Sequence, residues 1–186
     1  MAGTRPARVR QIGEMVVTEP MRCAVLTVSD TRSLDEDKSG HYLVGALKDM
    51  GHEVIAHQVL RDEPYDIRAQ VCRWIADPDP QVVLLTGGTG FSGRDSTVEA
   101  IEPIFDTTIQ GFGELFRQLS YQDIGSSTVQ SRAIAGLSNN TFVAALPGST
   151  GACRLAFEKI LREQLDSTHK PCNFVNLLKR GDARRS

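Results

Sequence analysis

A glycine-rich turn that leads to an acid is the stretch best equipped for chemistry. Val82 to Leu85 form an unbroken apolar run, which predicts a strand covered on both faces in a parallel sheet. The glycines within the next segment, Gly87–Gly90, can adopt backbone angles that a side chain forbids, so successive N–H groups can converge on an anion. Asp95 follows shortly afterwards. A carboxylate beside anion-binding amides indicates a phosphate ligand held together with Mg²⁺.

Two common phosphate loops and one structural alternative compete for this stretch. A Walker A loop ends in Gly-Lys-Ser/Thr, and it is excluded because the stretch contains no lysine. Gly88, Gly90 and Gly93 fit the dinucleotide pattern G-x-G-x-x-G. However, Pro103 cuts short the helix that an NAD(P)-binding oxidoreductase needs at this point. The structural alternative is an ordinary glycine-rich turn in which Asp95 caps a helix.

Strands and helices alternate along the chain, which predicts a parallel sheet with right-handed crossovers. We expect strands over Cys23–Val28, Glu53–Leu60, Val82–Leu85 and Thr141–Leu146. Ligands of such sheets gather at the carboxyl ends of the strands. Ser29, Asp62 and Thr86 come at such ends. We therefore expect Asp62 and Asp95 to face one cleft.

A second tight loop, Pro147–Thr150, precedes a helix whose N-terminus is aimed at the same edge of the sheet. The loop suits a phosphate or a ring carbonyl of a ligand, and the structural alternative is an ordinary helix cap by Ser149 or Thr150. The four histidines show no metal-ligand spacing, so we assign them no role.

Three further segments carry structural expectations. Ser39 is expected to cap the first helix, and Asp35 to Asp37 to lie in a solvated loop that favours its N-terminus. Residues 133–146 predict a hairpin. A helix over Gly111–Leu119 places Phe112, Leu115, Phe116 and Leu119 on one face, which predicts packing against the core.

The composition suits one globular domain. At 186 residues with 40% hydrophobic residues, the chain can bury a sizeable core. Its formal net charge of −2 argues against a general nucleic-acid binder, which carries a basic surplus. No apolar run is long enough to span a membrane, and scattered cysteines without a C-x-x-C pair indicate a reducing cytoplasm. We expect a domain over residues 21–170 between tails at 1–20 and 171–186.

Five short motifs carry a resemblance to a known family. They are LTVSD at Leu26–Asp30, DKSG at Asp37–Gly40, TGGTG with RDST at Thr86–Thr97, SRAIAG at Ser131–Gly136 and LPGST at Leu146–Thr150. Together and in this order they resemble the MogA/MoaB family of molybdenum cofactor biosynthesis proteins. The stretches SGHYL, GFGELFRQLS and PCNF look most like the MoaB branch.

The resemblance implies a three-layer α/β/α domain with a mostly parallel central sheet. It also implies binding of molybdopterin and its adenylylation by Mg²⁺-ATP, with release of pyrophosphate. Asp62 and Asp95 match the family's essential acids and its Mg²⁺ ligands. The family's pterin and phosphate pocket falls on Thr86, Gly87, Gly88, Thr89, Gly90, Ser131, Pro147, Gly148 and Ser149, and we add Ser29 and Arg94 as ligand-edge residues. A homo-oligomer, trimer or hexamer, and a molybdate-insertion enzyme are the further implied partners.

A non-catalytic carrier or scaffold of the MoaB type would use the same pocket without turnover. Many family members have proline where this chain has Gly93 and Val98, which implies a looser loop here. Both acids, Asp62 and Asp95, are retained, and this favours an active adenylyltransferase over the carrier.

Overall fold

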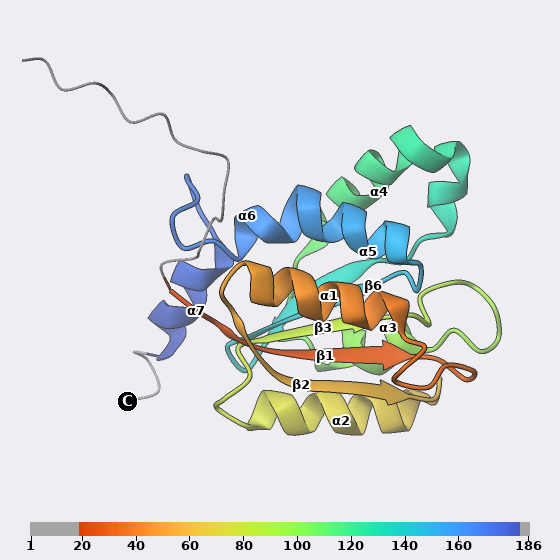
Figure 1. Ribbon diagram of the computed structural model, residues 1–186, viewed down its shortest axis with the longest axis horizontal. Helices are drawn as coiled ribbons and strands as arrows, with labels where there is room; N and C mark the ends of the chain where they lie inside the picture. The colour runs from red at the N-terminus through yellow and green to blue at the C-terminus, as the bar shows by residue number, and fades with distance from the viewer. Residues whose placement is uncertain (1–18, 183–186) are drawn as a thin grey trace, which may run out of the picture.

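The computed structural model describes residues 19–182, in which a six-stranded sheet carries helices on both faces (Figure 1). The strands are β1 (Arg22–Val28), β2 (Glu53–Leu60), β3 (Val82–Thr86), β4 (Thr107–Thr108), β5 (Ile134–Ser138) and β6 (Thr141–Leu146). Their order in the sheet is β2-β1-β3-β6-β5-β4. The first four of these pair in parallel, whereas β5 is antiparallel to both of its neighbours.

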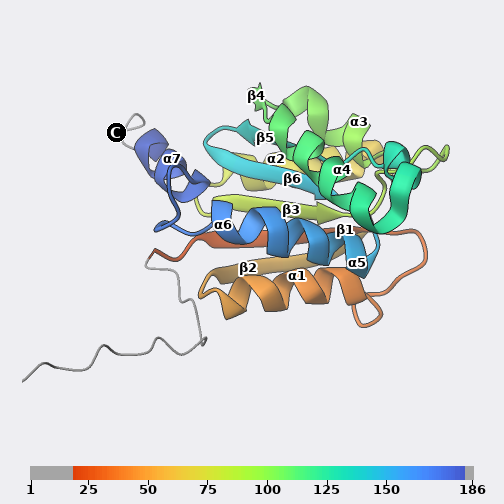
Figure 2. The same ribbon diagram turned by 90° about the horizontal axis from the view of Figure 1, so that it is seen from above.

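The helices form the two outer layers. They are α1 (Lys38–Asp49), α2 (Pro64–Ala76), α3 (Thr97–Ile101), α4 (Gln110–Ile124), α5 (Thr150–Ala156), α6 (Arg162–Gln164) and α7 (Phe174–Asp182). A π-helical segment, Phe157–Leu161, joins α5 to α6. Helix α2 covers one face of the sheet, and α1 with α5 covers the other (Figures 1 and 2). The three-layer, mostly parallel α/β fold expected from the sequence is therefore confirmed.

Alternation along β3 explains why its sequence is apolar throughout. Val82 and Leu84 pack into the core beneath α1, α4 and α5, while Val83 and Leu85 pack into the core beneath α2 and α3. Side chains at successive strand positions point to opposite faces, so a central strand with two covered faces needs apolar residues at every position. These four side chains have no exposed surface. The buried strand delivers the glycine turn to the edge of the sheet.

The hairpin predicted over residues 133–146 is formed by β5 and β6. Asn139 and Asn140 make its two-residue turn with φ values of 46° and 63°. Two successive residues with positive φ are typical of the turns that match the twist of paired strands, and asparagine tolerates them.

The ends of the chain differ from expectation. The tail predicted over residues 171–186 is wrong for its described part, because Phe174–Asp182 forms α7, with Val175 and Leu178 buried in the core. The tail predicted over residues 1–20 lies outside the described residues except for its last two. Within residues 19–182, no helix is both long enough and apolar enough to cross a membrane.

Candidate functional site

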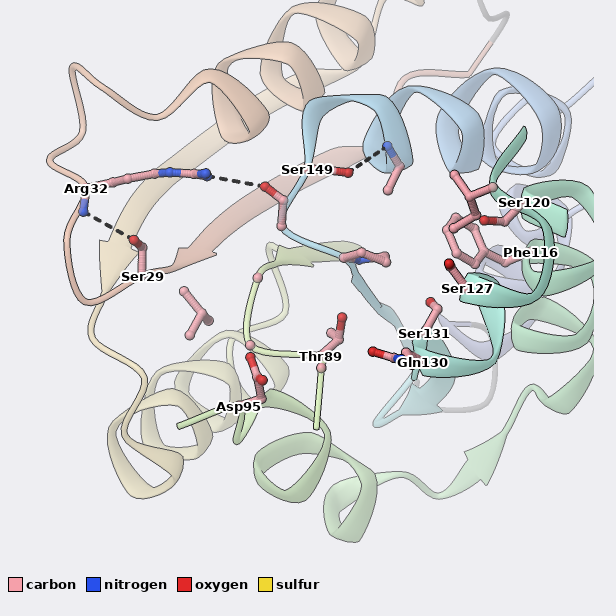
Figure 3. Close-up of a pocket in the computed structure, with 18 of the residues that line it drawn as sticks. Ser29, Arg32, Thr89, Asp95, Phe116, Ser120, Ser127, Gln130, Ser131 and Ser149 are labelled. Carbon is pink, nitrogen blue, oxygen red and sulfur yellow. Dashed lines mark hydrogen bonds between the residues drawn. The ribbon is translucent and has the colours of Figure 1, made fainter. Parts of the chain in front are cut away.

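A cavity of about 580 Å³ lies at the carboxyl ends of β1, β3 and β6 (Figure 3). Its walls come from the loop after β1, the glycine turn after β3, the loop before α5, and α4 with the following 3₁₀ turn (Gly125–Gln130). The predicted site residues among its lining are Ser29, Gly87, Gly88, Thr89, Gly90, Asp95, Ser131, Pro147, Gly148 and Ser149. Thr86, Asp62 and Arg94 do not line it.

Two glycines shape the turn after β3. Gly87 has φ +99°, and a Cβ there would lie 2.2 Å from the Val28 carbonyl oxygen. Gly88 has φ +63°, and a Cβ there would lie 2.3 Å from Thr97 Oγ1. Thr97 Oγ1 donates to the Gly87 carbonyl at 2.8 Å, and its N–H donates to the Gly88 carbonyl at 2.9 Å. The turn therefore requires glycine twice and is fixed by the threonine of the RDST motif.

The loop before α5 is organised by the helix that follows it. Ser149 is the N-cap of α5, and its Oγ accepts a hydrogen bond from the Ala152 N–H at 3.2 Å. The ordinary cap weighed from the sequence is thus present. A cap of this kind leaves the loop at the positive end of the helix dipole, beside the cavity that Ser149 also lines.

Among the described lining residues, only Arg32 and Asp95 carry a charged side chain at neutral pH. Arg32 Nη1 donates to the Gly148 carbonyl at 3.2 Å. The carboxylate of Asp95 accepts from the Ser92 N–H at 2.7 Å, and hydrogen bonding by Ser92 holds the pKa of Asp95 below its ordinary value. The cavity thus presents one cation and one carboxylate to a ligand (Figure 3).

Asp62 lies behind the glycine turn. Its side chain is buried, and Oδ1 accepts from the Ser96 N–H at 2.9 Å and from Ser96 Oγ at 2.5 Å. A Cβ on Gly88 would lie 2.6 Å from Asp62 Oδ2, and one on Gly90 would lie 2.7 Å from Asp95 Oδ2. The two acids therefore border the same turn, but only the Asp95 side chain lines the cavity. The Asp62 carboxylate instead accepts hydrogen bonds from Ser96.

Arg94 is engaged outside the cavity lining. Its Nε and Nη2 donate to the two carboxylate oxygens of Asp30 at 3.1 and 2.7 Å, a two-pronged pairing. Hydrogen bonding by Arg94 lowers the pKa of Asp30, and Asp30 in turn raises the pKa of Arg94. The Arg94 side chain is 63% exposed. Arg32, which the motif comparison did not single out, is the arginine that faces the cavity.

The opposite wall was missed from the sequence. It is formed by Phe116, Ser120, Ile124, Ser127 and Gln130, most of which Figure 3 shows across the cavity from Arg32. Phe116 was assigned to packing, and it is indeed 1% exposed, but its ring also borders the cavity. The Ser131 hydroxyl on this side is buried and has no hydrogen-bond partner in the described structure. Its donor is therefore available to a ligand.

The solvated loop predicted for Asp35 to Asp37 is wrong at Asp37, which has no exposed surface. Asp37, rather than Ser39, caps α1 by accepting from the Gly40 N–H at 2.8 Å. Its carboxylate also accepts from Thr27 Oγ1 at 2.5 Å and lies 2.9 Å from His57 Nε2. Burial opposes ionisation, but these three partners outweigh it and lower the pKa of Asp37.

Fold and site together define an α/β protein with a polar ligand cavity between a glycine turn and a helix N-terminus. A family model described as a probable molybdopterin binding domain matches residues 24–167. The chain belongs to this family, the MogA/MoaB proteins of molybdenum cofactor biosynthesis. The resemblance seen in the five motifs is thereby confirmed.

Individual relatives agree with this assignment. Molybdenum cofactor biosynthesis protein B of Escherichia coli K12 is 51% identical over 161 residues, covering 87% of this chain and 95% of the relative. A crystal structure of a molybdenum cofactor biosynthesis protein B is 42% identical with a TM-score of 0.81, covering 87% of this chain and 98% of the other. The tungsten cofactor synthesizing protein MoaB from Pyrococcus furiosus is 31% identical with a TM-score of 0.73, covering 89% and 99%.

Proposed function

We propose that this protein binds molybdopterin in the cavity and adenylylates it with Mg²⁺-ATP, releasing pyrophosphate. The observation that carries the proposal is that Arg32 and Asp95 both line one cavity, which lies between the glycine turn and the start of α5. Adenylyl transfer joins two anionic phosphates, so it needs a cation and donor groups for the phosphates and a carboxylate for Mg²⁺.

The pterin's terminal phosphate is an anion at neutral pH, so the reaction needs little help from a general base. A phosphate oxygen would form a bond to the α-phosphorus of ATP while the bond from that phosphorus to the oxygen bridging to the β-phosphate breaks. Pyrophosphate leaves with that electron pair. The contribution of the protein is to hold the reacting atoms in line, through Arg32, the amides of Gly88 to Gly90 and the loop before α5.

The acids of the glycine turn fit Mg²⁺. Mg²⁺ is usually held by one or two carboxylates and completed by water and substrate phosphates. The described residues contain no group of three or more His, Cys, Asp or Glu side chains that could hold a metal alone, which agrees with a site completed by the substrate. Asp95 would hold the ion with Asp62, and the bound ion would neutralise charge on the phosphates.

Arg94 is the remaining proposed phosphate ligand. In its pairing with Asp30 the guanidinium is held to one side of the cavity. To contact phosphates it must exchange the Asp30 carboxylate for a phosphate oxygen, and both groups accept the same two-pronged hydrogen bonding. The surface exposure of Arg94 permits this exchange at little cost.

The wall formed by Phe116, Ser120, Gln130 and Ser131 suits the pterin ring. Its hydroxyl and amide groups can pair with the edge of the pterin ring, while Phe116, at 1% exposure, adds little contact surface. The buried Ser131 hydroxyl without a partner is the clearest such group, because an unsatisfied buried donor costs about 1–3 kcal/mol until a ligand accepts from it.

A carrier function without turnover is the second candidate. The engagement of Asp62 by Ser96 and of Arg94 by Asp30 favours it, because both side chains are occupied outside the cavity lining. A carrier needs only the pterin half of the cavity. It would hand molybdopterin to a second enzyme, such as one that inserts molybdate.

Self-association is a further part of the proposal. Leu115, Tyr121 and Val129, on and just beyond α4, are 41%, 61% and 73% exposed. Leu115 was expected to pack in the core, but the fold leaves its side chain exposed. An exposed apolar side chain of this kind is available for contact with another subunit. Sedimentation should show a trimer or hexamer that Val129→Asp weakens, and a wild-type monomer would contradict this part of the proposal.

The proposed function is tested by measuring molybdopterin binding and pyrophosphate release on the same samples. The wild type should bind molybdopterin and release pyrophosphate from Mg²⁺-ATP only when molybdopterin is present. Ser131→Ala should weaken pterin binding, whereas Asp95→Asn should retain binding and lose release. Binding without any release by the wild type would leave the carrier, and failure to bind molybdopterin would contradict both candidates.

A further inference from the structure

Two successive carbonyl groups in the loop before α5 are held by side chains. The Pro147 carbonyl accepts from Thr86 Oγ1 at 3.1 Å. The Gly148 carbonyl accepts from Ser39 Oγ at 2.9 Å and from Arg32 Nη1 at 3.2 Å. A carbonyl oxygen has two lone pairs, so the oxygen of Gly148 is fully engaged. Ser39 does not line the cavity, whereas Gly148 does.

Holding a carbonyl also orients the amide on the other side of the same peptide. In a planar trans peptide the C=O and the N–H point in opposite directions. The peptide that joins Gly148 to Ser149 has its carbonyl directed at the Ser39 hydroxyl and the Arg32 guanidinium, so the Ser149 N–H is directed away from both side chains. Ser149 lines the cavity at the start of α5. Its N–H is therefore placed to donate to an anionic group there.

The start of α1 gives Ser39 little room to move. Ser39 is 1% exposed and follows the buried N-cap Asp37 by two residues. Asp37 is tied to β1 through Thr27 and to β2 through His57. A Cβ on Gly40 would lie 2.0 Å from Asp37 Oδ2, so only glycine fits after Ser39. The turn is a rigid support, and Ser39 transmits that rigidity to the ligand loop.

We propose that Ser39 is a positioning residue for ligand binding: its hydroxyl holds the Gly148 carbonyl and thereby points the Ser149 N–H at the ligand's anionic group. The identity of that ligand, molybdopterin, rests on the proposed function, whereas the orientation of the loop does not. Ser39 was expected only as a helix cap, a role that Asp37 fills instead.

A matched control separates positioning from ordinary stabilisation. Ser138 is also 1% exposed, and its Oγ donates to the Ile104 carbonyl at 2.7 Å, far along the sheet from the cavity. Ser39→Ala and Ser138→Ala each delete a buried hydroxyl-to-carbonyl bond, and Ser39→Ala also removes a longer contact of 3.4 Å with Thr150 Oγ1, so their effects on stability should be similar. Ser39→Cys keeps the side-chain volume but is a weaker hydrogen-bond donor. It therefore separates the loss of the hydrogen bond from a local collapse around the smaller alanine side chain.

The experiment measures molybdopterin affinity and amide hydrogen exchange over residues 147–152 in the absence of ligand. Ser39→Ala should weaken affinity by about two- to tenfold, the equivalent of one hydrogen bond, and speed exchange in this segment. Ser39→Cys should shift both in the same direction, and Ser138→Ala should change neither. Equal loss of affinity in Ser39→Ala and Ser138→Ala, or unchanged exchange in Ser39→Ala, would overturn the proposal. If the wild type does not bind molybdopterin, the proposed function fails, and the exchange rates alone decide whether Ser39 holds the loop.

Discussion

His52 makes the stability of this fold sensitive to mild acid. The residue is 4% exposed, and its Nδ1 accepts a hydrogen bond from the Met21 N–H at 3.1 Å. Because Nδ1 accepts, the neutral ring carries its proton on Nε2, and a second proton would have to replace this bond. Burial is the main cause that lowers the pKa of His52 to about 4, from an ordinary value of 6.5.

The sign and size of the effect follow from this pKa. The unfolded chain binds a proton near pH 6.5 and the folded chain does not until about pH 4, so stability is retained above pH 6.5 and lost as the pH falls toward 4. Between pH 7.5 and 5.0 this single group should reduce the free energy of unfolding by about 2 kcal/mol.

The assay is urea denaturation at both pH values and one fixed protein concentration. His52→Asn keeps an acceptor near the position of Nδ1 and removes the titration, so it should lose about 2 kcal/mol less than the wild type on acidification. Equal acid sensitivity in the wild type and His52→Asn would refute the reasoning.

Three further predictions concern the turn after β3 and its surroundings. Gly88→Ala should cost about 1–3 kcal/mol in urea denaturation, because φ is +63° and the new Cβ would meet Thr97, and a neutral result would contradict the described turn. Asp37→Asn should cost about 1.5–3 kcal/mol in the same assay, since the buried carboxylate accepts three hydrogen bonds, and a change below about 0.5 kcal/mol would count against that network. Arg94→Ala should leave the thermal midpoint unchanged, because its pairing with Asp30 is exposed, and a clear drop would show a structural role.

The sequence was sufficient for the parts of the fold that depend on local pattern. Unbroken apolar runs identified the central strands, because strands covered on both faces have no polar positions. The hairpin was recognisable from the pair Asn139-Asn140, and the glycine turn from Gly87 and Gly88. The cap at Ser149 was likewise local.

What the sequence could not provide depends on residues brought together from distant segments. In the sequence, Asp37 is one of several acids in a polar segment. Its burial could not be predicted there, because its carboxylate is held by Thr27 and His57 on neighbouring strands. Arg32 and Arg94 both lie in polar loops after strands, so the sequence does not distinguish them. The structure does, because Arg94 pairs with Asp30 and does not line the cavity, whereas Arg32 does. Val175 and Leu178, the buried residues of α7, have the i, i+3 spacing of an amphipathic helix, so this helix could have been predicted from the sequence and was overlooked.

The central claim is adenylyl transfer to molybdopterin at a site where Asp95 lines the cavity and Asp62 lies beside the same glycine turn. The most direct test is a single-turnover reaction of the purified protein with molybdopterin, Mg²⁺ and ATP labelled on its α-phosphate, run beside Asp62→Ala and Asp95→Ala. Labelled adenylyl-molybdopterin from the wild type, lost in both variants, is the predicted result. Wild-type protein that binds molybdopterin yet forms no labelled product would contradict the claim.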